Sequence, residues 1–160
     1  MINPDEKLKL WLDDQIVVQV SDTETRKVLV YHQGSRPNKN LPDEFIEILY
    51  NGSIKSLTKP IGFIKGDLAV TVYCKTQSDG TVKHKRVKSI LSQLGQLVSN
   101  KVIEGFFYEF NLNNIITPLY INYTNGYSTI TLNISWRTSD SQTSEKFVAL
   151  FDGLNILYTS

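Results

Sequence analysis

A change of hydrophobic period near the middle of the chain constrains the fold more than any other feature. Residues 68–76 alternate between two faces, both largely apolar, which predicts a buried strand. From about residue 81 the apolar side chains recur at helical spacing, which predicts an amphipathic helix over residues 82–100. Residues 103–110 return to strand character. The centre of the chain, Asp67 to Phe110, is therefore predicted to be a strand–helix–strand unit.

The N-terminal part is predicted to begin with a short helix. Asn3 followed by Pro4 is typical of a helix start, and the helix is expected to end between Asp14 and Val20. Val17 and Val18 are β-branched, so a strand beginning there is an alternative.

Strands and turns are predicted on both sides of the central unit. Residues 28–32 and 45–50 have strand composition, and the two prolines in residues 34–43 indicate a surface loop. Asn51-Gly52 predicts a hairpin turn that returns the chain through residues 53–58.

After the central unit, residues 119–123 lead into a second hairpin signal, Asn125-Gly126, and residues 129–136 alternate as a half-buried strand. Residues 138–144 are expected to form a polar loop. The last segment fits either a helix capped by Gly153, which we prefer, or a hairpin at Asp152-Gly153.

Together these elements predict an α+β fold: a mostly antiparallel sheet with one long amphipathic helix and a short N-terminal helix packed on it. The length of 160 residues is ordinary for one domain, so we expect a single domain over residues 1–160. The net charge of +1 provides no global field that would draw the protein to nucleic acid or to an anionic membrane.

The expected location follows from three absences in the sequence. The N-terminus lacks the basic and apolar regions of a signal peptide, and no apolar run approaches the roughly 18 residues of a membrane span. Cys74 is the only cysteine, which excludes an internal disulfide and suits a reducing compartment. We therefore expect an intracellular protein at synthesis.

The residues that could support catalysis are few. His32 lies in a predicted strand, His84 in a basic run, and Cys74 on the face of a strand that points to the core. No histidines, cysteines or carboxylates have metal-site spacing, and glycine-rich phosphate loops are absent. The sequence thus argues against an enzyme, a metal site and a cofactor. The aromatic residues at 106–110 lack basic neighbours, which favours core packing over base stacking.

One basic cluster begins the long predicted helix. Its cations oppose the helix dipole, so local helix stability does not explain them. They would suit phosphate or an acidic surface on a partner, and a solvated basic turn is the alternative. The residues of this cluster are Lys83, His84, Lys85, Arg86 and Lys88.

The order of elements resembles that of the tail-terminator and head–tail joining proteins of long-tailed bacteriophages. The resemblance rests on residues 66–73 (Gly-Asp-Leu-Ala-Val-Thr-Val-Tyr), the polar turn at 77–80 and the helix through Leu97. It covers about residues 1–137, and residues 138–160 form a C-terminal extension beyond it.

The resemblance implies a structural protein of phage or prophage assembly. Such a subunit would form a homo-oligomeric ring, expected to be a hexamer, that caps the tail tube and meets the head connector. DNA would pass through the ring without specific binding, and no membrane would be involved. The resemblance also implies candidate interfaces in the 34–41 loop, with Arg36, Asn38 and Lys39, in the 77–86 loop that leads into the basic cluster, and in the C-terminal segment. The protein would belong to the tail or neck of the virion and reside in the host cytoplasm during assembly.

Three other functions stay open at the level of sequence. A baseplate or connector adaptor would also act through assembly contacts, but it would bind different partners. A nucleic-acid-binding module would use the basic turn Lys83 to Lys88 and bind DNA in a salt-dependent manner. An enzyme of unrecognised type is the third.

Overall fold

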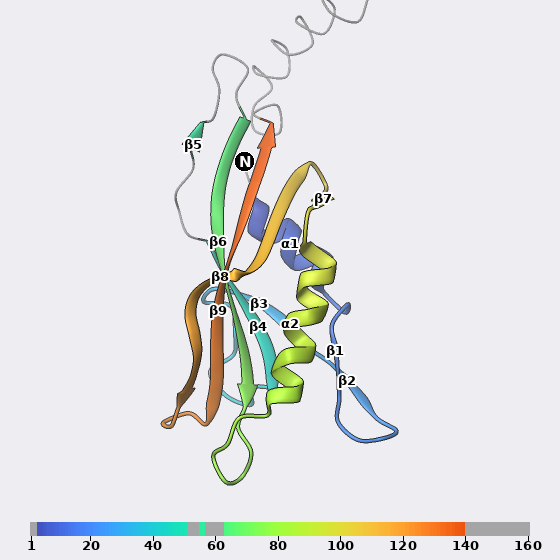
Figure 1. The fold of residues 1–160 in the computed structure, drawn as a ribbon, viewed down its shortest axis with the longest axis vertical. Coiled ribbons are helices and arrows are strands. Elements are labelled where there is room, and N and C mark those ends of the chain that lie inside the picture. Colours follow the sequence, from blue (N-terminus) through green and yellow to red (C-terminus); the bar gives the residue numbers. More distant parts are fainter. Residues whose placement is uncertain (1–2, 51–54, 57–62, 140–160) are drawn as a thin grey trace, which may run out of the picture.

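The structure is a computed structural model that describes residues 3–50, 55–56 and 63–139 (Figure 1). Two helices and nine strands follow one another in the described ranges: α1 (Pro4–Leu12), β1 (Val17–Gln19), β2 (Thr25–Lys27), β3 (Leu29–His32), β4 (Glu44–Tyr50), β5 (Lys55–Ser56), β6 (Phe63–Lys75), α2 (His84–Val98), β7 (Lys101–Ile103), β8 (Phe106–Asn122) and β9 (Tyr127–Ser139).

Seven strands form one mixed sheet in the order β3-β4-β6-β9-β8-β7, with β5 paired to β6. Only β3 and β4 pair in parallel, and every other pair in the sheet is antiparallel. β1 and β2 form a separate two-stranded hairpin. The ribbons of β6, β8 and β9 overlap at the middle of Figure 1 and run in different directions above and below it, although β6 and β9 are paired along their whole length, so the sheet is curled rather than flat.

Both helices pack on one face of this sheet and enclose the main core. α2 buries one apolar stripe, and alternate side chains of β6 and β9 pack against this stripe. Gly95 brings α2 close to β8, because a Cβ there would lie 3.0 Å from the Phe110 ring. The core side chains contributed by these elements are Val87, Ile90, Leu94, Val98, Leu68, Val70, Val72, Leu132, Ile134 and Trp136.

The other face of the sheet carries a smaller aromatic cluster. Phe45 stacks on Tyr73 with ring centroids 4.4 Å apart, and Tyr127 meets Phe45 edge-on at 5.5 Å. Arg36 lies over the Tyr73 ring at 5.2 Å and pairs with Glu47 at 3.4 Å. The loop between β3 and β4 is therefore fastened to this second face.

The predicted fold class is wrong. The described chain is mostly β, with two short helices and a curled mixed sheet, instead of an antiparallel sheet dominated by one long helix. The helix predicted over residues 82–100 is α2, His84–Val98, and the predicted strands merge into longer ones. β8 runs through an asparagine-rich stretch because pairing with β9, interrupted by register shifts, outweighs the low strand propensity of asparagine.

The parallel pair β3–β4 was also missed. Residues 33–43 connect these strands without a helix or strand of their own, so periodicity in the sequence does not reveal that the chain crosses over there.

The N-terminal helix is shorter than predicted. α1 starts at Pro4 as expected but ends at Leu12, and Asp14 has a left-handed φ of 64° that turns the chain. The β-branched residues that follow form β1, so the alternative of a strand is the correct one. Gln93 of α2 accepts from the backbone N–H of Val17 at 3.1 Å and donates to its carbonyl at 2.8 Å, which fastens the β1–β2 hairpin to α2.

The strand–helix–strand order around Asp67 to Phe110 is confirmed, with a turn inside its last part. Glu104 and Gly105 both have positive φ and join β7 to β8, where one strand was predicted. The hairpin turn at Asn125-Gly126 is confirmed between β8 and β9, and Gly126 has a φ of 74°.

Several predictions fall on residues outside the described ranges. These are the Asn51-Gly52 turn and the fold of the C-terminal segment after Ser139. Thr138 and Ser139, expected to begin a polar loop, instead end β9. Neither of the two described helices is long and apolar enough to cross a membrane.

Candidate functional site

An open cleft lies where β6 ends, α2 begins and the β8–β9 turn passes. Its volume is about 1020 Å³. We call it the cationic cleft, because four cations and a histidine line it against one carboxylate, that of Asp43. The lining residues are Gln19, Asp43, Lys75, Thr76, Gln77, Ser78, Val82, Lys83, His84, Lys85, Arg86 and Gly126.

The turn between β6 and α2 fixes one wall of the cleft. Its backbone is closed by hydrogen bonds from Gln77 N to Thr81 O at 2.8 Å and from Gly80 N to Gln77 O at 2.9 Å. Asp79 accepts from both the N–H and the hydroxyl of Thr81, at 3.0 and 2.6 Å, and these bonds lower the pKa of its carboxyl. The lysines that follow the turn are thus presented from an ordered backbone.

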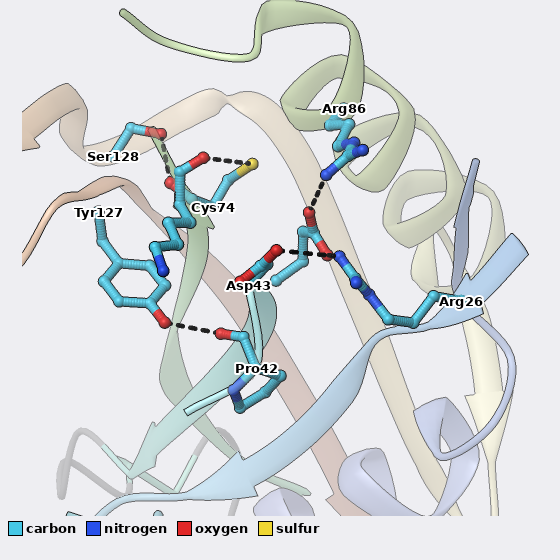
Figure 2. A network of polar contacts seen from close by, with 9 residues as sticks. Arg26, Pro42, Asp43, Cys74, Arg86, Tyr127 and Ser128 are labelled. Carbon is cyan, nitrogen blue, oxygen red and sulfur yellow. Dashed lines mark hydrogen bonds and ion pairs between the residues drawn. The ribbon is translucent and has the colours of Figure 1, made fainter. Parts of the chain in front are cut away.

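A buried carboxylate, Glu44, follows the cleft residue Asp43 in sequence and is the shared acceptor of Arg26 and Arg86, both labelled in Figure 2. It is only 1% exposed, and it accepts from Arg86 of α2 at 2.6 Å and from Arg26 of β2 at 2.5 Å. Arg26 also lies 3.5 Å from Asp43. The hydrogen bond to Glu44 raises the pKa of Arg26. Three elements, β2, β4 and α2, are therefore joined through one side chain.

This arrangement explains why a cation, Arg86, stands in the first turn of α2, where it opposes the helix dipole. Because Glu44 faces the first turn of α2, a residue distant in sequence supplies the anion that the helix itself lacks there. Arg86 is thereby neutralised inside the protein and is less available to a partner than predicted.

The lysines near Arg86 lack such a carboxylate partner among the described residues. In the part of the chain that the structure describes, no carboxylate pairs with Lys75, Lys83 or Lys85. His84 and Lys88 are exposed, and Lys88 lies outside the cleft lining. Elsewhere some cations pair with a carboxylate and others in the described ranges do not. Those that pair are Lys7, Lys9, Lys27, Arg36 and Arg137, and those that do not include Lys39, Lys65 and Lys101.

Hydrogen bonds behind the cleft hold its walls together. Tyr127 donates to the carbonyl of Pro42 at 2.7 Å, and Ser128 donates to that of Cys74 at 2.9 Å (Figure 2). Burial raises the pKa of the Cys74 thiol to about 11, so it stays protonated at neutral pH. The thiol therefore packs as a small apolar group.

The other predicted interface residues lie elsewhere. Arg36 is held over the aromatic cluster of the second face, while Asn38 and Lys39 are exposed in the same loop. The structure thus brings Lys83, His84, Lys85 and Arg86 together in the cleft and separates them from the 34–41 loop.

A second surface feature is apolar. β7 pairs only with the first three residues of β8, so in the described ranges no strand pairs with the outer edge of β8 beyond Tyr108. Large side chains are exposed along this stretch by 37–54%; we call them the apolar β8 surface: Ile115, Ile116, Leu119 and Tyr120.

Two charged cleft residues were missed at the level of sequence. Lys75 ends β6 directly before the polar turn, and Asp43 precedes β4. The sequence could have pointed to them only as charged residues at the ends of predicted strands. Glu44 gives no sequence signal, because its role depends on two arginines far away in the chain.

In the described ranges no three His, Cys, Asp or Glu side chains gather in a way that could hold a metal ion. No protein-family model matches the chain, and no curated protein matches it in sequence.

Proposed function

We propose that this protein is a ring-forming subunit of the neck of a long-tailed bacteriophage or prophage, a tail terminator or head–tail joining protein. In this role it caps the tail tube, meets the head connector and acts through shape rather than chemistry. It belongs to the virion after assembling in the host cytoplasm.

The observation that carries the proposal is the apolar β8 surface. Edge strands that expose large apolar side chains invite contact with another chain, and natural monomers usually protect them. Pro118 and the register shifts of β8 disfavour simple strand addition, because proline lacks an N–H and the bulges twist the edge. We therefore expect side-chain packing of a neighbouring subunit against this surface.

A closed ring requires two different surfaces that fit each other, since each subunit contacts the next in a head-to-tail manner. α1 and β7 contact each other and expose a second apolar group, Leu10, Trp11 and Val102, by 60%, 40% and 71%. In Figure 1, α1 and β7 lie on the right and the Asn122 end of β8 lies at the lower left. Two apolar surfaces in different places suit a heterologous contact.

The test is native mass spectrometry of the full chain at high concentration, with and without isolated tail tubes. We expect closed oligomers, or monomers that assemble on the tubes. Tyr120→Asp and Val102→Asp should each reduce assembly, because each places a carboxylate in one of the two apolar surfaces. Lys65→Asp, an exposed position outside both surfaces, is the control. Strict monomers that also fail to bind tail tubes would refute the proposal.

Two alternatives share some of the support. A baseplate or connector adaptor would use the same apolar surfaces with different partners, which binding assays with separate tail components would distinguish. A nucleic-acid-binding module is favoured by the unpaired cations of the cleft, and it predicts an affinity for DNA that falls steeply with salt.

A further inference from the structure

We infer that the cationic cleft is a docking site for a carboxylate-rich segment of a partner protein. The inference rests on the proposed assembly function for its context and names the chemistry of one partner contact. It concerns a surface distinct from the apolar β8 surface.

The first argument is electrostatic. Lys75 comes from the end of β6, while Lys83 and Lys85 come from the start of α2, so the unpaired cations reach the cleft from two elements. Glu44 and Asp43 together balance the charges of Arg86 and Arg26, so the excess positive charge resides on the lysines. Gathering like charges in one concave site is unfavourable without a counter-charge, which a partner's carboxylates would supply.

The second argument is shape. A volume of about 1020 Å³ lies just above the range for small-molecule pockets, about 300–1,000 Å³, and the cleft is open. Polar side chains that donate or accept hydrogen bonds stand between the cations: Gln19, Thr76, Gln77 and Ser78. Such a lining suits an extended polar segment better than one small anion.

The lining also favours protein over nucleic acid as the occupant. None of the described residues that line the cleft is Phe, Tyr or Trp, so apart from the His84 imidazole bases would find no stacking surface. Asp43 places a carboxylate in the wall, and the net charge of the chain is only +1, so long-range attraction of a polyanion is weak. An acidic peptide requires only the local contacts.

The experiment measures fluorescence anisotropy with the full chain at dilute concentration. The probes are a labelled oligoglutamate peptide, an oligoglutamine peptide of the same length and a double-stranded DNA of comparable length. Lys83→Ala/Lys85→Ala removes two cations from the cleft, and Lys39→Ala/Lys101→Ala removes two exposed cations elsewhere as the matched control. Circular dichroism checks the fold of each, and Lys75→Ala provides an independent cleft variant on a different element.

We expect oligoglutamate to bind more tightly than oligoglutamine and DNA. Lys83→Ala/Lys85→Ala should weaken oligoglutamate binding roughly 2- to 30-fold, which corresponds to the loss of two exposed ion pairs. Lys75→Ala should weaken this binding less, and the control double variant should leave it unchanged. Equal losses in the control and cleft variants would overturn the inference, as would equal binding of the two peptides or tighter binding of DNA through the same lysines. Because the assay uses dilute protein, its result is independent of ring formation, and a failed ring test would leave it intact.

Discussion

Replacing Glu44 should be the most damaging change near the cleft. In Glu44→Ala the carboxylate that joins β2, β4 and α2 is lost, and two guanidinium groups lose their acceptor. Arg86 is about one-fifth exposed, so its lost bond to a charged group is expected to cost about 2 kcal/mol. Arg26 is 38% exposed and can be rehydrated, so its share is discounted to about 1 kcal/mol or less.

The sum, about 3 kcal/mol, can be measured by urea unfolding at neutral pH. The matched control is Glu109→Ala, which removes a carboxylate that is 55% exposed and lies 3.8 Å from Arg137, and should cost no more than about 0.5 kcal/mol. The variant Glu44→Ala/Arg86→Ala should be less destabilised than the sum of its single changes, because the partners share one interaction. A loss for Glu44→Ala no larger than that of the control would refute the view that Glu44 holds these elements together.

Three further predictions concern other parts of the fold. The pKa of the Cys74 thiol rises to about 11 on folding, so the unfolded chain releases this proton at lower pH than the folded chain does. The free energy of unfolding should therefore fall as pH rises above about 9. Cys74→Ala should make this fall less steep between pH 9 and 10, measured by unfolding at each pH. Tyr108→Phe removes the 2.6 Å hydrogen bond to the carbonyl of Pro4, and α1 amides should exchange faster with a stability loss of about 1 kcal/mol. Gly126→Val forces a β-branched residue to a φ of 74°, so it should lower stability by about 1–3 kcal/mol, read by thermal unfolding.

The local elements of this fold could be predicted because their causes are local. The apolar stripe of α2 and the alternation of buried residues in β9 each depend on residues close together in the sequence. Asn125-Gly126 has the conformational freedom that its turn requires. β8 could not be predicted as one strand. Its continuity depends on pairing with β9 across register shifts, which the sequence of β8 alone does not contain.

The candidate site was predictable in part for the same reason. Lys83 and Lys85 could be singled out because they oppose the local helix dipole, which is a property of adjacent residues. That Arg86 would be internal and Lys75 would join the cleft could not be predicted, since both follow from how β4 and β6 pack beside α2. Arg36 likewise could be identified as a cation in a loop, whereas its position over Tyr73 depends on the sheet.

The proposed contact at the apolar β8 surface and the proposed contact at the cationic cleft both depend on the fold around Glu44. A subunit that packs its apolar β8 surface against a neighbour must keep β9, β6 and the cleft aligned, because β9 pairs with β8 and with β6, whose end forms the cleft. By pairing with Arg86 and Arg26, Glu44 fixes the start of α2 without using the lysines beside it, and Asp43 supplies a second carboxylate next to Arg26. If the lysines were needed for folding, removing them would destabilise the protein; since they pair with no carboxylate in the described ranges, their replacement should alter partner binding while leaving the unfolding free energy nearly unchanged.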